Sequence, residues 1–132
     1  MTAGSWARRE ARMTEPFPES LIVTVNALRE RQAEDLRVLY VRDVSTVTDY
    51  FVLATANSAP HLRALAEETD SSRKDARIKM TRKGGSPESG WSVLDFGDVV
   101  THIMTEELRE FYALEQLWSD GKTVNPDDIP ER

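Results

Sequence analysis

Two aspartates and a histidine lie close together in the sequence and are the residues best suited to chemistry. Asp95 and Asp98 are separated by two residues, and His102 follows soon after. Paired carboxylates can hold a metal ion if two or three ligands converge from rigid positions. Asp98, however, directly follows Gly97, and aspartate and glycine are both typical of tight turns. The pattern therefore favours a turn over a metal site, and we expect no bound metal.

Nucleophilic catalysis has equally little support. Ser58 and His61 fall within one helical first turn, where they are more typical of helix caps than of a nucleophile and its base. The chain has no cysteine, which excludes disulfides and thiolate chemistry. Gly84 and Gly85 lack the flanking pattern of a phosphate-binding loop. We therefore expect a protein that is not an enzyme and that needs no cofactor.

The elements that would position these residues form one domain. The chain of 132 residues can bury a core without cross-links. Helical periodicity predicts a helix from Ser20, as its cap, to about Glu34, and Asn57, Ser58 and Pro60 predict the start of another. Further predictions are strands at 36–41, 50–55, 91–96 and 99–104, a short edge strand at 77–81 and a loop at 84–90. A last helix is predicted to begin at Thr105 and to be stopped by Gly121. The order α-β-β-α-β-β-α indicates an α/β (α+β) fold, a small mixed sheet with helices mainly on one face.

The two ends of the chain lack a periodic pattern. Residues 1–18 are predicted to be a flexible extension, residues 19–121 the domain, and residues 122–132 a disordered acidic tail. No apolar run approaches the roughly 18 residues that span a bilayer. Residues 1–13 have no apolar stretch typical of a secretory signal. We expect a cytoplasmic protein, with an organellar location as the alternative.

Charge is distributed unevenly along the chain. The net charge of −6 makes the whole protein a poor general binder of nucleic acid. A basic run nevertheless extends from Arg73 to Lys83, and it could contact phosphate if another surface positioned it there. On charge alone, a solvated edge strand kept from aggregating by its cations is the favoured interpretation.

The segment from Gly90 to Ile103 predicts a β-hairpin. Gly97-Asp98 fits a type II′ turn, which places glycine first. One face of this hairpin resembles plain core, and it carries Leu94, Phe96, Val99, Thr101 and Ile103. The other face is mixed, with Trp91 and Asp95 diagonal to His102, and it carries Trp91, Val93, Asp95, Val100, His102 and Met104. Spacing alone leaves open whether the mixed face covers core or docks a partner.

Three ordered motifs resemble the Iojap family, the ribosomal silencing factors. They run from Asp43 to Ser58 (with His61), from Trp91 to His102 and from Arg109 to Trp118. The resemblance spans roughly Ser20 to Asp120. Where this chain has Ala56, Phe96 and Thr101, the family often has glycine, tyrosine and an apolar residue, which puts the detailed contacts in question but not the fold.

The resemblance implies a domain related in fold to nucleotidyltransferases but without their activity. It implies binding to the large ribosomal subunit through its protein fourteen, which blocks joining of the small subunit and represses translation when nutrients are short; a role in ribosome assembly is also implied. Trp91 is the leading interface candidate. The partner-binding candidates are Trp91, Leu94, Asp95, Phe96, Asp98 and His102, and the candidate contacts to ribosomal RNA are Arg77, Lys79, Arg82 and Lys83.

Two alternatives remain open from the sequence. One is a nucleotidyltransferase-like enzyme that uses Asp95 and Asp98 with a metal. The other is a homodimer that pairs the mixed hairpin face with a second copy, so the free protein is either a monomer or a homodimer. No membrane partner is expected.

Overall fold

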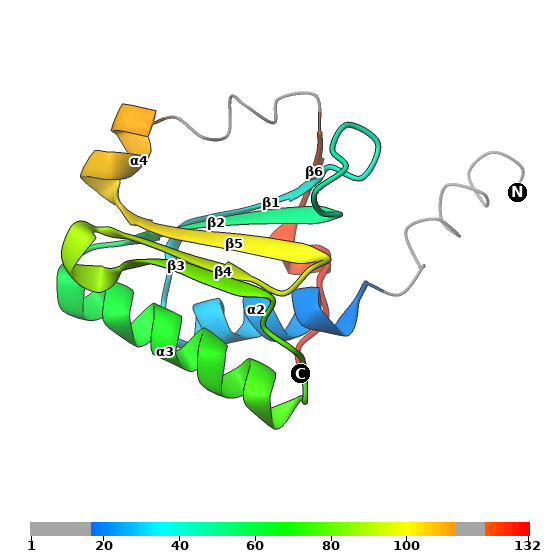
Figure 1. The fold of residues 1–132 in the computed structure, drawn as a ribbon, viewed down its shortest axis with the longest axis horizontal. Helices are drawn as coiled ribbons and strands as arrows, with labels where there is room; N and C mark the ends of the chain where they lie inside the picture. The colour runs from blue at the N-terminus through cyan, green and yellow to red at the C-terminus, as the bar shows by residue number, and fades with distance from the viewer. Residues whose placement is uncertain (1–16, 113–120) are drawn as a thin grey trace, which may run out of the picture.

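A six-stranded mixed sheet forms the centre of the molecule, with helices on both sides (Figure 1). The computed structural model describes residues 17–112 and 121–132. Along the sheet the strands follow the order β3-β4-β5-β2-β1-β6; β2 and β5 pair in parallel, and the other neighbours are antiparallel. The strands are β1 (Glu34–Tyr40), β2 (Tyr50–Ala56), β3 (Arg82–Ser86), β4 (Trp91–Asp95), β5 (Val99–Thr105) and β6 (Lys122–Val124).

Helices α2 (Glu19–Glu30) and α3 (Ala59–Asp75) lie on one side of the sheet, and α4 (Glu106–Tyr112) lies on the other (Figure 1). Two 3-10 turns, Pro87–Ser89 and Pro126–Asp128, complete the described elements. This arrangement confirms the predicted α/β class with helices mainly on one face. The likeness to nucleotidyltransferases stays a prediction. None of the helices in the described ranges is both long and apolar enough to cross a membrane.

The core is divided between the two faces of the sheet. The larger cluster packs beneath α2 and α3 and includes Leu21, Leu28, Val52, Leu62, Leu94 and Ile103. A smaller cluster on the opposite face includes Leu39, Phe51, Leu53, Val100 and Met104, with Leu108 of α4 against it. Because β2 contributes residues to both clusters, it is covered on both faces, as its almost wholly apolar sequence predicted.

The first helix differs from its prediction at both ends. It begins at Glu19, directly after Pro18, and ends at Glu30 rather than near Glu34. Ser20 lies within the helix and is 5% exposed, so it is not the cap. Its hydroxyl instead donates a hydrogen bond to Oδ1 of Asp98 at 2.6 Å. Ser20, which the local sequence favours as a cap, therefore forms a hydrogen bond to a residue far away in the sequence instead.

The edge strand lies further along the chain than predicted. Its expected position at 77–81 is irregular. Strand β3 instead occupies Arg82–Ser86 and so overlaps the first half of the loop predicted at 84–90. Gly85 has a φ of +69°, and a Cβ there would lie 1.9 Å from the Trp91 carbonyl oxygen. Glycine at this position thus permits a close approach of two strands rather than marking a loop.

The predicted disordered tail is ordered in the structure, which corrects that expectation. Strand β6 pairs with β1, and Ile129 is 2% exposed within the larger core cluster. At the other end, Phe17 is partly buried and its ring meets that of Tyr50, with centroids 6.4 Å apart. Residues 1–16 of the predicted extension, and residues 113–120 of the predicted last helix, lie outside the described residues.

Candidate partner-binding surface

The predicted hairpin register is confirmed pair by pair. Trp91 is opposite Met104, Val93 opposite His102, and Asp95 opposite Val100. At the turn, Phe96 N–H donates to Val99 O at 2.9 Å, and Gly97 has a φ of +92°. A positive φ at this position is what a type II′ turn requires of its first central residue. The two faces of the hairpin are therefore the two faces predicted.

Leu94 and Phe96 are corrected as partner-binding candidates. Leu94 is fully buried and Phe96 is 7% exposed, and both belong to the cluster beneath α2 and α3. A partner could reach these side chains only if the helices moved away from the sheet. Their burial explains their apolar character without a binding role.

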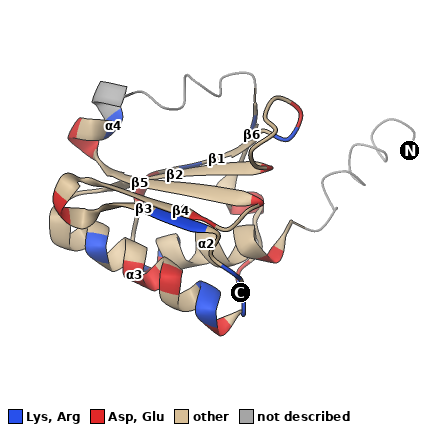
Figure 2. Ribbon diagram, in the orientation of Figure 1, with Lys and Arg blue, Asp and Glu red and all other residues tan. Residues whose placement is uncertain are grey.

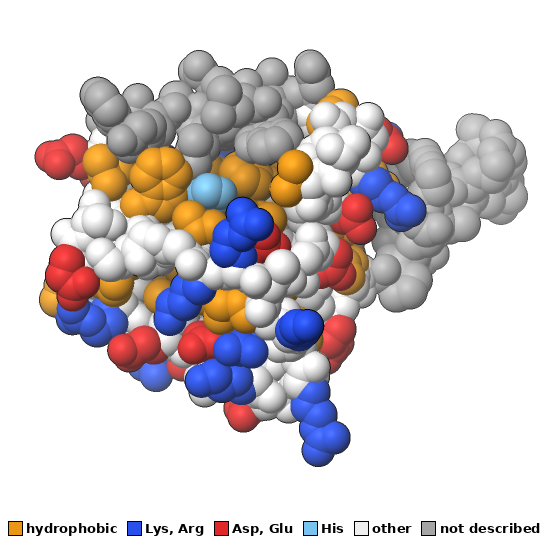
Figure 3. All heavy atoms as spheres, in the orientation of Figure 1, with side chains coloured by type: hydrophobic (Ala, Val, Ile, Leu, Met, Phe, Trp, Pro, Cys, Tyr) orange, Lys and Arg blue, Asp and Glu red, His pale blue; other side chains and the backbone are white. Residues whose placement is uncertain are grey.

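The mixed face presents a partly buried group that we call the hairpin surface: Trp91, Val93 and His102. The indole Nε1–H of Trp91 donates to Nδ1 of His102 at 2.9 Å. The imidazole also packs against Phe51, with ring centroids 4.7 Å apart, and against Trp91 at 5.8 Å. In the space-filling view, a histidine lies between hydrophobic side chains on this side of the molecule (Figure 3).

Burial makes His102 a neutral hydrogen-bonding group. It lowers the pKa of His102 from 6.5 to about 4, so the ring carries no charge near neutral pH. Because Nδ1 accepts from Trp91, the single ring proton resides on Nε2. Within the part of the chain that the structure describes, Nε2 has no hydrogen-bond acceptor. The hairpin surface therefore offers a donor held in a fixed orientation among apolar groups.

Asp95 and Asp98 serve the turn and do not converge on a common point. Oδ1 of Asp95 accepts from Gly97 N–H at 2.8 Å, and Oδ1 of Asp98 accepts from the Ser20 hydroxyl. The backbone carbonyl of Asp98 accepts from the N–H groups of Asp49 and Tyr50, which ties the turn to the start of β2. In the described ranges, no three His, Asp or Glu side chains group closely enough to hold a metal ion.

Ser58 caps α3 as predicted, whereas the His61 ring is not a cap and has other structural partners. Ser58 Oγ accepts from His61 N–H at 3.1 Å at the start of α3. His61 Nδ1 accepts from Asn57 N–H at 3.0 Å, and Nε2 donates to the carbonyl of Arg31 at 2.8 Å. Nε2 thus connects the start of α3 to the end of α2, and Nδ1 contacts the residue before the Ser58 cap. Because both ring nitrogens are engaged, His61 is unsuited to act as a general base.

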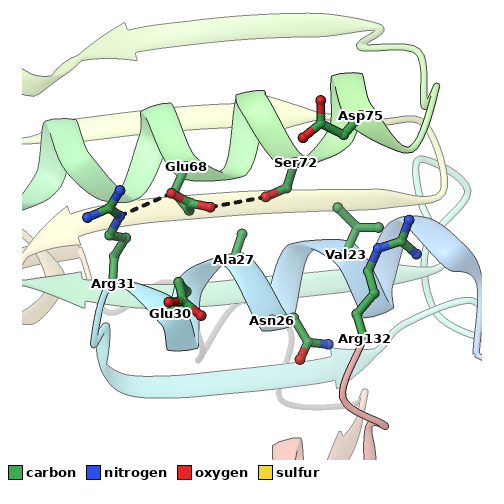
Figure 4. A pocket seen from close by; sticks show the side chains of 9 residues that line it. All are labelled: Val23, Asn26, Ala27, Glu30, Arg31, Glu68, Ser72, Asp75 and Arg132. Carbon is green, nitrogen blue, oxygen red and sulfur yellow. Dashed lines mark hydrogen bonds and ion pairs between the residues drawn. The ribbon is translucent and has the colours of Figure 1, made fainter.

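A polar cavity of about 630 Å³ lies between α2 and α3, on the helix side of the sheet (Figure 4). Three of its polar side chains, those of Arg31, Glu68 and Ser72, interact with one another. Arg31 Nε lies 3.0 Å from Glu68 Oε1, and the Ser72 hydroxyl donates to Glu68 Oε2 at 3.4 Å. The contact between Ser72 and Glu68 is long for a hydrogen bond, and Glu68 is also paired with Arg31. The cavity is lined by Val23, Asn26, Ala27, Glu30, Arg31, Glu68, Ser72, Asp75 and Arg132.

Sequence reasoning did not identify two notable residues. Arg109 of α4 is 5% exposed, and its Nη1 donates to the Asp35 carbonyl at 2.7 Å and to Thr55 Oγ1 at 2.6 Å, which fastens α4 to the sheet. Val47, in the loop before β2, is 72% exposed. A buried arginine gives no periodic signal, and Val47 lies between two threonines in a segment without a periodic apolar pattern.

The predicted cationic contacts lie at one edge of the sheet. Arg77 and Lys79 occupy the connection between α3 and β3, whereas Arg82 and Lys83 lie on β3 itself; all four are exposed. Figure 2 shows this basic stretch along β3. We call these four residues the basic edge.

Comparison with known proteins identifies a single family. Residues 14–132 match the sequence model described as ribosomal silencing factor during starvation. A ribosomal silencing factor of Halalkalibacterium halodurans is 32% identical over 84% of this chain and 95% of its own length. A Mus musculus protein named for mitochondrial assembly of the ribosomal large subunit is 35% identical over 72% of this chain and 43% of its own length. A crystal structure from Bacillus halodurans superposes with a TM-score of 0.72 at 32% identity, covering 81% of this chain and 97% of that one.

Proposed function

Because this chain belongs to the ribosomal silencing factor family, as its three motifs predicted, we propose that it binds the large ribosomal subunit and keeps the small subunit from joining. Translation would thereby be repressed when nutrients are short. The proposed contact on the subunit is its protein fourteen, which the family resemblance implies. The name of the mouse relative supports a further role in assembly of the large subunit.

The hairpin surface is the observation that carries this proposal. Trp91 combines a large apolar area with a polar group, a combination enriched at the energetic centres of protein interfaces. Its hydrogen bond to His102 holds the indole in one orientation before any partner arrives. A side chain that is already ordered loses less conformational entropy on binding, which favours affinity.

An inhibitor of this kind acts by occupying the surface of the large subunit that the small subunit must contact, and it needs no catalytic step. A typical specific interface buries about 800 Å² on each partner, which a face of two or three strands with adjacent loops can supply. Asp95 and Asp98 lie at the turn beside the hairpin surface and remain proposed polar contacts. We accordingly propose a binding protein that is not an enzyme and that acts without a cofactor.

Cosedimentation with purified large subunits tests the proposal. Replacing a central interface tryptophan typically weakens binding by 2 kcal/mol or more, so Trp91→Ala should bind about thirtyfold more weakly than the wild type. Circular dichroism must show that the variant remains folded. Glu30→Ala, on an exposed residue of the helix side, is the matched control and should bind normally. Wild-type affinity of Trp91→Ala would exclude the hairpin surface as the interface.

Two further measurements separate the blocking step from binding. In one measurement, small subunits are added to large subunits that were first mixed with either the wild-type protein or Trp91→Ala. The sample with the wild-type protein should contain fewer joined ribosomes. Light scattering of the free protein then shows whether a second copy occupies the same surface. A dimer that Trp91→Ala dissociates uses the hairpin surface, whereas a dimer that persists in the variant uses another one.

A further inference from the structure

Most lysines and arginines in the described parts of this acidic protein have carboxylate partners. Examples among the described residues are the ion pairs Arg31–Glu68, Arg37–Asp35 and Arg73–Asp70. Apart from Lys122, the cations without a carboxylate within 4.0 Å in the described ranges are the four residues of the basic edge. Arg77, Lys79, Arg82 and Lys83 thus concentrate unpaired positive charge in a chain whose net charge is −6.

The fold places these cations on both faces of one sheet edge. Strand β3 is the outermost strand beyond β4. Arg82 is opposite Asp95 and therefore lies on the face of the hairpin surface, whereas Lys83 is opposite Leu94 and lies on the helix side. In Figure 3, basic side chains adjoin the apolar group around the histidine. The basic edge is therefore continuous with the hairpin surface.

In the connection before β3, partly buried apolar residues alternate with exposed charged residues. Ile78 and Met80 are partly buried and pack against the larger core cluster, so Arg77 and Lys79 between them are exposed. Gly84, next along the edge, has no side chain, and a Cβ there would meet only Val93 at 3.8 Å. A partner can therefore approach the backbone closely beside four flexible cations.

One residue of the basic edge, Lys83, adds to the positive charge around Asp70 of α3. Partial burial by itself would raise the pKa of Asp70. The hydrogen bond from Arg73 and the charges of Arg73, Lys74 and Lys83 outweigh burial and hold the pKa below its usual value. Arg73 makes the main contribution, and Lys83 adds a smaller one although it forms no ion pair with Asp70.

We propose that the basic edge binds the phosphate backbone of a ribosomal RNA segment that lies beside the hairpin surface when the protein is docked on the large subunit. This inference rests on the function proposed above. Lysine is depleted at the centres of protein interfaces, and the segment 77–83 contains no aromatic residue that could anchor a protein partner. Phosphate contacts need only accessible positive charge, so RNA fits this edge better than an acidic protein does.

The salt dependence of binding tests the charge contribution. The variant carries Arg77→Gln, Lys79→Gln, Arg82→Gln and Lys83→Gln, and the matched control carries Arg31→Gln, Arg37→Gln, Arg63→Gln and Lys122→Gln. Each phosphate contact contributes about 0.7 to 0.9 to the slope of log affinity against log salt. Between about 50 and 200 mM salt, at constant magnesium, the wild type and the control should therefore lose roughly 60-fold more affinity than the edge variant.

The absence of cysteine permits a direct test of what lies beside the edge. A single cysteine, Thr81→Cys, can carry a tethered iron chelate that releases hydroxyl radicals within the complex with large subunits. We expect cleavage of ribosomal RNA from this site and none from Glu30→Cys on the helix side. The cysteine-free wild type treated with the same reagent gives the background.

The possible outcomes distinguish failure of the proposed RNA contact from failure of the proposed function. Equal affinity and salt slope for the edge variant would overturn the inference alone and leave the cations as protection against edge-to-edge pairing. Weakened binding without RNA cleavage would point to an acidic protein surface and would also overturn it. If the wild-type protein does not bind large subunits at all, the proposed function fails and the inference fails with it.

Discussion

The indole N–H of Trp91 donates a hydrogen bond to Nδ1 of His102 at 2.9 Å, from one strand of the hairpin to the other. The two residues are diagonal neighbours, since Trp91 is opposite Met104 and His102 is opposite Val93. The bond requires an unprotonated Nδ1, so the orientation of the proposed interface tryptophan is linked to the charge state of the histidine. Acid would remove the acceptor that holds the indole in place.

The first prediction concerns stability in acid. The pKa of His102 is about 4 in the folded protein, below the ordinary value of 6.5, so the unfolded state binds the proton first. Stability from this group is fully present above the ordinary pKa and is lost as the pH falls through the folded value. By about pH 4.5 the loss should reach roughly 2 to 3 kcal/mol. Urea unfolding at several pH values measures it.

The variant His102→Asn isolates this effect from the titration of carboxylates. Asparagine can accept from Trp91 through Oδ1, which replaces Nδ1, but it does not titrate. The stability of the wild type should fall below that of the variant progressively between about pH 6.5 and pH 4, after correction for their difference at neutral pH. Parallel curves for the two proteins would contradict the pKa and the burial that causes it.

Local rules were sufficient to predict the hairpin. A strand alternates its side chains strictly, and Gly97 fixes the position of the turn, so the two faces follow from counting. Residue spacing could not decide which of the two faces is buried in the core and which is exposed. Leu94 and Val93 are both apolar, and only the position of α2 and α3 decides that Leu94 is buried and Val93 is partly exposed.

Non-local pairing explains the elements that the sequence did not predict. The segment Lys122–Val124 has no amphipathic pattern of its own and becomes a strand because β1 offers it an open edge. Gly84 and Gly85 have low strand propensity, yet pairing with β4 makes them part of β3. Ser20 lacks its expected capping role because its hydroxyl donates a hydrogen bond to Asp98, which lies far away in the sequence.

The second prediction tests the bond between Ser20 and Asp98. A buried hydroxyl bound to a carboxylate contributes about 1.5 to 3 kcal/mol, so Ser20→Ala should lower the free energy of unfolding by that amount. Ser71→Ala, at an exposed position of α3, is the control and should change it little. In a double-mutant cycle with Asp98→Ala, which removes the acceptor, the two losses should not add. Additive losses would show that the bond contributes nothing.

The third prediction concerns the start of α3. Ser58 Oγ accepts the N–H of His61, and removal of such a cap costs about 1 kcal/mol. Ser58→Ala should therefore be destabilised by this amount in urea unfolding. Ser58→Asn should recover most of the loss, because asparagine is an equally good cap. If the asparagine variant is no more stable than the alanine variant, the serine does not act as a cap.

The fourth prediction tests the order of the carboxyl-terminal segment. Ile129 is 2% exposed, and the chain around it is fastened to α2, where Asn26 Nδ2 donates to the carbonyl of Pro130 at 2.9 Å. Truncation of a buried isoleucine to alanine removes apolar contacts and leaves a cavity, so Ile129→Ala should cost about 2 to 5 kcal/mol in urea unfolding. Val47→Ala, at a side chain 72% exposed, should change stability by less than about 0.5 kcal/mol. A similarly small change for Ile129→Ala would mean that residues 122–132 are disordered in solution, as their composition alone predicts, and that β1 lacks a partner at its outer edge.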